Sequence, residues 1–421
     1  MMVKERQLTN GVRVLMEKLP GMRSVTVGIW ARAGSVMESP AQNGISHFIE
    51  HMLFKGTKRR NYKQIAEEID NIGGQMNAFT SKEMTCYYAK VIDERLDVAV
   101  DVLCDMYCHS VFDEKELKKE KGVVLEEIAM SGDNPEDVAH EKISETFFAG
   151  NCLGQTILGP AENIRRFTRD DIRAYMNERY FAENTVVAVV GNYDEEALLA
   201  MLEEKLECLP KKGGPAYVAK DELWAPKKSF CLVEKDIEQA HVGLAFPSLT
   251  FDHKDKYALS VLSNVLGGSM SSRLFQKIRE EMGMAYSVYC YSSLYRNNGM
   301  LAIYAGTSAE NAPKANDAIL AEVRRMKSDL LTKDELENTK EQLRGNYILG
   351  QESSSAKMNA IGRSAMLGCK PKEEAEVLSL LSAVTMDDIA RVAETVFDEE
   401  KMSGIFVGAV AGCRSLEAMF S

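Results

Sequence analysis

The stretch Ser46-His47-Phe48-Ile49-Glu50-His51-Met52 is the most informative part of this 421-residue sequence. Two histidines four residues apart lie one above the other on the same face of a helix, so a helix here would supply two ligands for a zinc ion. Glu50 adjoins the second histidine, and its carboxylate could hold or deprotonate a water molecule at the same ion. The order His-x-x-Glu-His is the reverse of the commoner zinc-binding order. The alternative interpretation is a helix that carries two surface histidines.

Length and composition indicate a globular protein of two to three domains. Hydrophobic residues make up 45% of the chain and charged residues 27%, which is ordinary for a soluble protein. The net charge at pH 7 is -12, from 51 basic and 63 acidic residues. A negative charge of this size repels nucleic-acid phosphates and anionic lipids, and the basic clusters are short, such as residues 55–60. We therefore expect no nucleic-acid and no membrane partner.

The sequence favours a cytoplasmic location. Residues 1–7 are charged and then alternate, without the apolar run of a signal peptide, and no stretch approaches the roughly twenty apolar residues of a membrane span. The nine cysteines are odd in number and scattered, mostly in apolar runs, as expected of reduced thiols. Cys104, Cys108 and His109 lie close together and could be metal ligands, but the apolar setting of residues 102–108 favours the core face of a helix.

Hydrophobic periodicity predicts a mixture of strands and helices in the first half of the chain. Strands are expected at residues 12–15 and 24–33. The motif lies on a helix whose apolar side chains face away from His47, Glu50 and His51. Further along, we expect a helix over 62–72, two strands within 75–92 joined by a turn at Ser81-Lys82-Glu83, and helices over 95–112 and 114–130.

A third metal ligand is expected on a rigid element, because a catalytic zinc ion takes three protein ligands and keeps one position open for water. The predicted helix over 114–130 offers Glu120, Glu126 and Glu127. Glu120 and Glu127 are seven residues apart and share a helix face, whereas Glu126 is rotated by about 100° from Glu127. Glu127 could therefore bind the metal while Glu120 hydrogen-bonds a ligand. The alternative is that all three are solvated helix carboxylates.

The second half of the chain repeats the first. Thr168-Arg169-Asp170-Asp171-Ile172 recurs as Thr385-Met386-Asp387-Asp388-Ile389, at an offset of 217 (385 minus 168). Residues 112–117 are echoed by 331–336 at an offset of 219 (331 minus 112), and Val27-Gly28 by Val242-Gly243 at 215 (242 minus 27). Three patches at nearly the same offset indicate two similar halves of mixed strands and helices.

The junction between the halves is Pro210-Lys211-Lys212-Gly213-Gly214-Pro215, whose Lys, Gly and Pro residues are typical of an exposed linker. We therefore predict an N-terminal half over 1–212 that carries the zinc site, a linker over 213–226, and a degenerate C-terminal half over 227–421. The offset of 217 places Asn264 and Gly268 opposite the two motif histidines, and Arg344 opposite Glu127. The second copy thus lacks the metal ligands, and its predicted role is recognition or support.

The run at residues 47–57, His-Phe-Ile-Glu-His-Met-Leu-Phe-Lys-Gly-Thr, with Glu120 and Glu127 downstream, resembles the pitrilysin/insulinase family of inverted-motif zinc peptidases. It is most similar to the short bacterial branch, related to the beta subunit of the mitochondrial processing peptidase. In this family the third ligand follows the second histidine by about the separation found here, 76 residues (127 minus 51), and another glutamate precedes it by seven. Blocks at 77–83, 158–159 and 267–275 extend the resemblance over nearly the whole chain.

The resemblance implies an α+β fold of two homologous mixed α/β halves, each an antiparallel-rich sheet with helices packed on it, arranged as a clamshell. It also implies a zinc-dependent endopeptidase that hydrolyses peptides or unfolded polypeptide segments in a chamber between the halves. His47, His51 and Glu127 would hold one Zn2+ per chain. Glu50 would act as the general base, and Glu120 would hold a ligand in place.

The same resemblance implies how the substrate is bound. The peptide would add as an extended strand at Asn77, Ala78 and Phe79, where main-chain hydrogen bonds give affinity with little demand on sequence. Arg279 and Tyr286 match the family's arginine and tyrosine that reach from the second half to the substrate carbonyl, where a developing oxyanion needs donors. Without the resemblance, these two would be read as a helix-surface arginine and a core tyrosine.

A different class of function is a non-catalytic scaffold, or the recognition subunit of a heteromeric peptidase of the same fold. Relatives of that kind usually lose ligands from the histidine motif, whereas this chain keeps His47, Glu50, His51 and Glu127. We therefore favour the enzyme. Because long members of the family carry about twice as many repeats in one polypeptide, we expect a homodimer here, with a heterodimer as the alternative.

Overall fold

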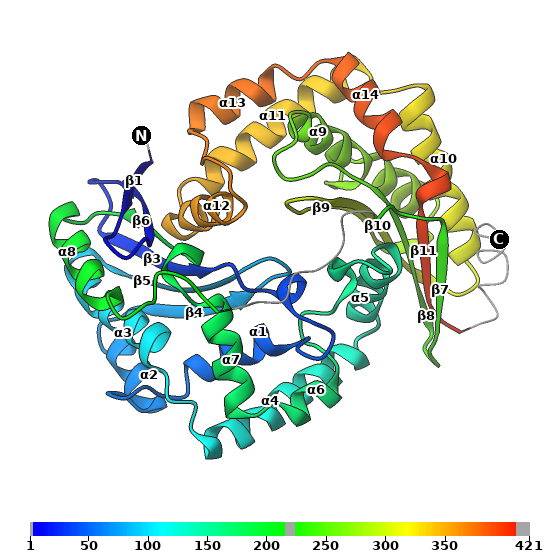
Figure 1. The fold of residues 1–421 in the computed structure, drawn as a ribbon. Coiled ribbons are helices and arrows are strands. Elements are labelled where there is room, and N and C mark those ends of the chain that lie inside the picture. Colours follow the sequence, from blue (N-terminus) through cyan, green and yellow to red (C-terminus); the bar gives the residue numbers. More distant parts are fainter. Residues whose placement is uncertain (1–2, 215–223, 410–421) are drawn as a thin grey trace. The chain divides into compact units, whose positions relative to one another are not determined.

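The structure of the chain, a computed structural model, describes residues 3–214 and 224–409 (Figure 1). These residues form two compact units, each a β-sheet with helices packed on it. The first unit comprises Met1–Ile128, Gln155–Lys220 and Ile348–Glu373, and the second comprises Ala129–Gly154, Asp221–Tyr347 and Glu374–Ser421.

The first unit contains a six-stranded sheet. Its strands are β1 (Lys4–Gln7), β2 (Arg13–Lys18), β3 (Ser24–Ala31), β4 (Gln75–Thr80), β5 (Thr85–Ile92) and β6 (Thr185–Gly191). They lie in the order β1-β2-β6-β3-β5-β4, with β2 and β6 parallel and the other neighbours antiparallel. All residues of β6 are buried, as expected of a central strand with a continuous apolar sequence.

Helices cover both faces of this sheet. They are α1 (Ile45–Leu53), α2 (Tyr62–Asp70), α3 (Leu96–His109), most of α4 (Glu114–Asp133), α6 (Ala161–Arg166), α7 (Arg169–Arg179), α8 (Glu195–Leu206) and α12 (Ser354–Met366). Both α3 and α12 pack on β3. Val27 and Ile29 of β3 belong to the hydrophobic core that includes α3, whereas Thr26 and Gly28 face α12, because successive side chains of a strand point to opposite faces.

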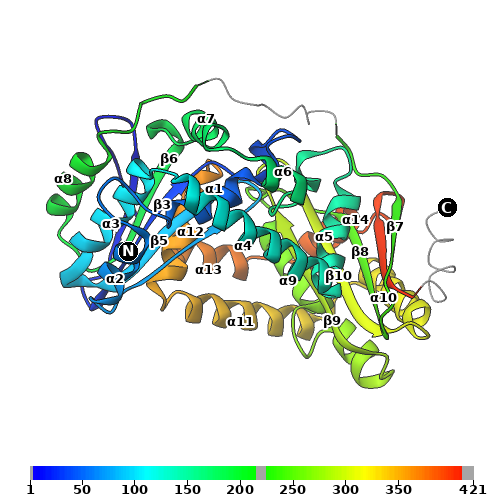
Figure 2. The ribbon, with the colours of Figure 1, turned by 90° about the horizontal axis from the view of Figure 1, so that it is seen from below.

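The second unit contains a five-stranded sheet. Its strands are β7 (Ser229–Glu234), β8 (Gln239–Pro247), β9 (Ala285–Leu294), β10 (Gly299–Ser308) and β11 (Ser403–Gly408), in the order β7-β11-β8-β10-β9. Its helices are α5 (Pro135–Phe147), α9 (Lys256–Gly267), the π-helical segment η5 (Phe275–Glu281), α10 (Ala312–Ser328), most of α11 (Lys333–Gly350), α13 (Glu374–Ser382) and α14 (Met386–Val396). Figure 2 shows the same elements from a second direction.

The two sheets have the same topology, which confirms the predicted fold class of two similar mixed α/β halves. Without β1, the order β2-β6-β3-β5-β4 matches β7-β11-β8-β10-β9 strand for strand. Each sheet has one parallel pair, β2 with β6 and β7 with β11. The repeated sequence also folds alike, because Thr168 with Asp171 and Thr385 with Asp388 form equivalent capping boxes at α7 and α14.

The compact units interleave along the chain. Helix α5 packs on β8 and β11 in the second unit, and α12 packs on β3 and β6 in the first. These two helices begin at an offset of 219 (354 minus 135), so they are repeat equivalents that each join the sheet of the other half of the sequence. The division at 1–212 and 227–421 stays a prediction about the sequence repeat. Hydrophobic periodicity predicts that a segment is a helix, but it does not predict on which sheet that helix packs.

Within the described ranges, no helix combines the length and the apolar character that crossing a membrane requires.

Small residues let α12 lie close to β3. A Cβ atom on Gly362 of α12 would lie 2.2 Å from Cε2 of Trp30, and one on Gly28 would lie 2.5 Å from Sδ of Met358. The hydroxyls of Thr26 and Ser354 are hydrogen-bonded at 2.8 Å in the same contact. The large, buried indole therefore takes the space that a side chain on Gly362 would need, and the side chain of Met358 takes the space beside Gly28.

We expect Gly362→Ala to lower the stability of the chain by about 1–3 kcal/mol, because the new methyl group overpacks against a ring that is enclosed on all sides. Gly345→Ala in α11 is the matched control, since nothing lies within 4 Å of its added Cβ and alanine favours a helix by about 1 kcal/mol. Urea unfolding followed by circular dichroism measures both. Equal midpoints for the two variants would contradict this account of the packing.

Candidate metal centre

Helix α1 begins where a buried carboxylate binds its first turn. Gly44 precedes the helix with a left-handed backbone, φ 96°, which glycine adopts without strain. Glu38 accepts hydrogen bonds from the N–H groups of Gly44 at 2.8 Å and Ser46 at 2.9 Å. Burial raises the pKa of Glu38, and these hydrogen bonds act against the rise. A hydrogen-bonded acceptor at the helix N-terminus fixes where α1 starts, and hence where its histidines point.

The two faces of α1 divide as the sequence predicts. One face is buried in the core of the first unit and consists of Ile45, Phe48, Ile49, Met52 and Leu53. His47, Glu50 and His51 occupy the remaining surface of the helix. The apolar face anchors the helix, so the three polar side chains project from a rigid support.

Three potential metal ligands converge from two helices. Oε2 of Glu127 on α4 lies 3.6 Å from Nε2 of His47 and 3.5 Å from Nε2 of His51. One ligand atom from each of the three lies within 4.8 Å of the others. In the part of the chain that the structure describes, no other group of three His, Cys, Asp or Glu side chains meets this limit. The structure therefore brings together the three residues predicted as ligands.

The separations of these atoms fit a zinc ion. Zinc bonds to nitrogen and oxygen at about 2.0–2.2 Å, so two ligand atoms of a tetrahedral site lie about 3.4 Å apart. The distances from Glu127 to the two imidazoles are close to this value and too long for strong hydrogen bonds. Two histidines and one glutamate, with a fourth position left open, are also the donor set of catalytic zinc sites.

The two imidazoles have different protonation behaviour. Burial, together with the charge of His51, lowers the pKa of His47 to about 4, so His47 is neutral and able to bind a metal at pH 7. Burial also acts to lower the pKa of His51. Its hydrogen bond to Glu120 and the charges of the nearby carboxylates outweigh burial, and the pKa of His51 is raised overall.

Glu120 orients one of the predicted ligands. Its Oε1 accepts a hydrogen bond from Nδ1 of His51 at 2.8 Å, and its Oε2 forms an ion pair with Nζ of Lys55 at 2.7 Å. Burial acts to raise the pKa of Glu120, but the contacts with His51 and Lys55 lower it overall. With its proton on Nδ1, His51 presents the lone pair of Nε2 toward Glu127.

Glu50 is held beside the three donors by a contact with the sheet. Thr80, the last residue of β4, donates a hydrogen bond from its hydroxyl to Oε2 of Glu50. Burial raises the pKa of Glu50, the hydrogen bond from Thr80 and the charge of His51 lower it, and the charge of Glu127 raises it further. The net effect is a raised pKa, and a carboxyl group with a raised pKa is suited to accept and return a proton near neutral pH.

The predicted substrate-binding residues Asn77, Ala78 and Phe79 lie on β4. This strand ends the sheet and pairs only with β5 among the described strands. The N–H of Ala78 donates to the side-chain oxygen of its neighbour Asn77 at 2.8 Å. β4 is therefore an edge strand that leads directly to Thr80 and Glu50, and an extended peptide can pair with such an edge.

The predicted pair Arg279 and Tyr286 belongs to the second unit. The Arg279 guanidinium stacks over the rings of Phe275 and Tyr286, at 4.6 Å and 5.2 Å from the ring centroids. Both predicted residues line a cavity of 520 Å³ whose wall also includes Thr307. Tyr286 is 83% exposed, so it is not the core tyrosine that its sequence context alone would indicate.

Three residues of the site were missed in the sequence. Lys55 lies four residues after His51, one helical turn onward, so its position near Glu120 could have been inferred from spacing. Thr80 directly follows the predicted substrate-binding block. Glu38 carried no signal, because it reaches α1 from the preceding loop.

The comparisons with known proteins identify the family of the chain. A family model described as Insulinase (Peptidase family M16) matches residues 13–161, and one described as Peptidase M16 inactive domain matches residues 166–343. A Bacillus subtilis protein named as the uncharacterized zinc protease YmxG is 44% identical over 399 residues, which cover 95% of this chain and 97% of that protein. A Streptomyces coelicolor protein, also named as an uncharacterized zinc protease, is 39% identical over 94% of this chain and 87% of its own length.

The fold is shared with solved structures. The crystal structure of a protease from Helicobacter pylori superposes with a TM-score of 0.90 at 23% identity, over 97% of this chain and 99% of that one. A structure described as the peptidase M16 inactive domain from Pseudomonas fluorescens gives a TM-score of 0.90 at 20% identity. Together with the relatives in sequence, these matches show that the chain belongs to the pitrilysin/insulinase family, peptidase family M16.

We expect Glu120→Gln to weaken zinc binding by about 10–100-fold. A neutral amide holds the imidazole of His51 less firmly than a carboxylate does, and it makes the ligand nitrogen of that imidazole less basic. Lys55→Met should weaken binding in the same direction by a smaller factor, since Glu120 keeps its charge but loses one contact. Competition with a chromophoric chelator measures the affinity. Glu126→Gln is the control, because Glu126 lies on the same helix and is exposed. Equal zinc affinity in the Glu120 and Glu126 variants would contradict the assigned role.

Proposed function

We propose that the protein is a zinc-dependent endopeptidase that cleaves peptides or unfolded polypeptide segments. The observation that carries this proposal is the convergence of His47, His51 and Glu127 within 4.8 Å, with Glu50 on the same helix as the two histidines. His47, His51 and Glu127 would hold one Zn2+ per chain. A bound zinc ion supplies Lewis-acid chemistry, polarising the substrate carbonyl and lowering the pKa of water.

Glu50 is the proposed general base. It would take a proton from a water molecule as the water attacks the carbonyl carbon of the peptide bond, and would then pass the proton to the leaving amine. Two features support this role. The pKa of the Glu50 carboxyl is raised, and the hydroxyl of Thr80 holds Oε2, so the carboxylate keeps one orientation in both proton transfers.

The substrate would add to β4 as a further strand, at Asn77, Ala78 and Phe79. Main-chain hydrogen bonds would give most of the affinity, so the demand on substrate sequence would be small. The free edge of β4 and its end at Thr80 support this proposal, because a strand paired there would pass beside Glu50. The side chain of Asn77 now accepts from the Ala78 N–H and would have to release that group to the peptide.

Arg279 and Tyr286 are proposed to donate hydrogen bonds to the carbonyl oxygen of the substrate. The family resemblance implies that role, and closure of the two halves over a chamber would be needed to complete the site. The exposure of Tyr286 and the stacking that restrains Arg279 support it, because both groups are available and one is already ordered.

We also propose a homodimer that works in the cytoplasm, which would enclose peptides as longer family members do within one chain. The eight cysteines in the described ranges are free thiols, as a reducing compartment favours. Sedimentation velocity distinguishes a dimer from a monomer, and a monomer that cleaves peptides at the full rate would refute the need for pairing.

The experiment that tests the function is cleavage of a quenched fluorescent peptide library by the full chain, with and without a chelator, together with metal analysis. We expect about one zinc per chain and chelator-sensitive hydrolysis that zinc restores. Glu50→Gln should keep its zinc and lose about 10²–10⁴-fold in kcat. Glu126→Gln is the matched control and should keep both its zinc and its rate of hydrolysis. Full hydrolysis by zinc-loaded Glu50→Gln would refute the assignment, and a zinc-loaded wild type without hydrolysis would favour the non-catalytic scaffold.

We expect Tyr286→Phe to lower kcat by about 10²-fold with little change in KM, because a hydroxyl that donates to a developing oxyanion acts mainly in the transition state. Tyr62→Phe is the control, since Tyr62 is also exposed, at 56%, and lies at the start of α2. Steady-state kinetics on one peptide from the library measures both variants. A loss confined to KM would indicate that Tyr286 binds substrate without contributing to the chemical step.

A further inference from the structure

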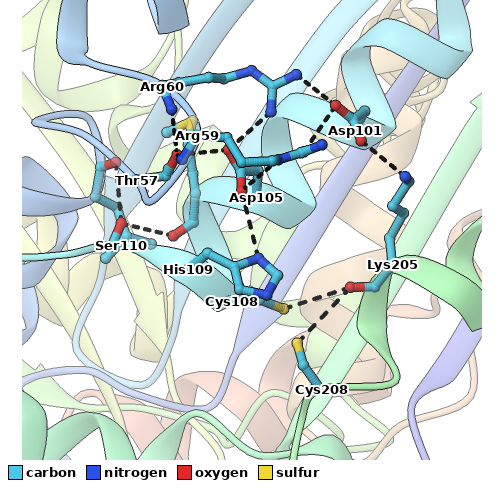
Figure 3. Close-up of polar contacts among 12 residues, drawn as sticks. Thr57, Arg59, Arg60, Asp101, Asp105, Cys108, His109, Ser110, Lys205 and Cys208 are labelled. Atoms are coloured by element: carbon cyan, nitrogen blue, oxygen red, sulfur yellow. Dashed lines mark hydrogen bonds and ion pairs between the residues drawn. The ribbon is translucent and has the colours of Figure 1, made fainter.

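Two cysteines from distant parts of the sequence meet at one carbonyl group. Cys108 lies at the end of α3, and Cys208 follows α8, which packs along α3. The thiols of both residues donate to the backbone oxygen of Lys205, each at 3.9 Å (Figure 3). Figure 3 shows their sulfur atoms on the same side of this oxygen. A shared acceptor holds the two side chains next to one another.

The two thiols have complementary properties. The contact with Cys108 and the positive charge of Lys58 lower the pKa of Cys208 despite its partial burial. The same contact and burial raise the pKa of Cys108. Cys208 is exposed, whereas Cys108 is half-buried. One thiol is thus accessible and has a lowered pKa, and the other lies more sheltered beside it.

A small molecule can reach the accessible thiol. Cys208 lines a cavity of 390 Å³, whose wall also includes Arg59, His109 and Lys205. Glu204 and Glu207 belong to the same wall, so its charges are mixed and do not select the charge of the reagent. A cavity of this size accommodates a small peptide-like disulfide at the sulfur atom of Cys208.

We propose that Cys108 and Cys208 are a redox-active pair that forms a reversible disulfide when the protein meets a low-molecular-weight disulfide. The thiolate of Cys208 attacks one sulfur of the reagent and releases one thiol, leaving a mixed disulfide. The sulfur of Cys108 then attacks Cys208 and releases the second thiol. Two protein thiols are oxidised and one disulfide is reduced to two thiols, which carry away both protons.

The new bond would act on the end of α3, which contacts α1, the helix that carries the two motif histidines. The carbonyl oxygen of His109, the residue after Cys108, accepts a hydrogen bond from the backbone N–H of Lys58 at 3.1 Å. The hydroxyl of Ser110 lies 3.4 Å from the carbonyl oxygen of Leu53, the last residue of α1. A disulfide between Cys108 and Cys208 would join the end of α8 covalently to the end of α3, where α3 contacts the end of α1. The bond would not involve the proposed zinc ligands.

The test is a titration of the full chain with oxidised glutathione. We expect the loss of two of the nine thiols, a peptide pair joined through Cys108 and Cys208 in unreduced mass spectra, and complete reversal by dithiothreitol. Cys108→Ser should stop at a glutathione adduct on Cys208, because the second attack is lost. Cys208→Ser should form neither the glutathione adduct at position 208 nor the disulfide with Cys108. Cys231→Ser, at a half-buried cysteine of β7, is the control and should behave like the wild type.

The proposal fails if the folded wild type accumulates the glutathione adduct on Cys208 without a bond to Cys108, or if Cys104 is the partner recovered. Circular dichroism of each variant before oxidation establishes that it is folded, and Cys208→Ser alters an exposed side chain, so its result stands even if Cys108→Ser is unstable. Peptide hydrolysis is not a readout in this experiment, so its outcome is independent of the proposed endopeptidase activity.

Discussion

Electrostatic repulsion is the constraint on which the geometry of the candidate metal centre depends. Glu50, Glu120 and Glu127 crowd around two imidazoles, and two unit charges 4 Å apart interact by about 4 kcal/mol at an effective dielectric constant near 20. The chain supplies a counter-group for two of the three carboxylates: Lys55 pairs with Glu120, and the hydroxyl of Thr80 binds Glu50. Glu127 instead faces the two Nε2 atoms. Among the described residues, Glu127 therefore has no such counter-group beside it, and a cation between Glu127 and the two histidines would relieve the repulsion.

The second copy of the fold has an amide contact between the helices that are equivalent to α1 and α4. Helices α9 and α11 stand in the second unit where α1 and α4 stand in the first, as the matching sheet order and the sequence offset require. Asn264 of α9 donates from Nδ2 to Oε1 of Gln342 on α11 at 3.0 Å. A hydrogen bond between two neutral amides needs no ion. Loss of the charged donors thus removes the demand for a metal while the topology of the half is preserved.

Local pattern was enough to predict the elements in the first half of the chain. It left the third ligand open among the glutamates of α4, and the family resemblance selected Glu127. What the sequence did not predict are contacts between separate segments. The turn at Ser81-Lys82-Glu83 lies between β4 and β5 as predicted, and the seven-residue spacing of Glu120 and Glu127 places both toward α1. The spacing could do so because a helix converts it directly into a shared face. No such rule relates Glu38 to the start of α1, or α5 to the second sheet, since these contacts depend on how separate segments pack.

A buried charge links the metal helix to the thiol pair. The carboxylate of Asp105 on α3 is fully buried and accepts hydrogen bonds from Thr57 at 2.7 Å, Arg59 at 3.2 Å and Arg60 at 2.8 Å (Figure 3). Burial acts to raise the pKa of Asp105, but these hydrogen bonds lower it overall, so the group stays charged. Breaking such a pair strands a buried charge at a cost of about 3–5 kcal/mol. These contacts therefore join the segment after α1 to helix α3. Cys108 lies one turn further along α3, so the proposed disulfide would act on the end of α3 that contacts α1, without involving a proposed zinc ligand.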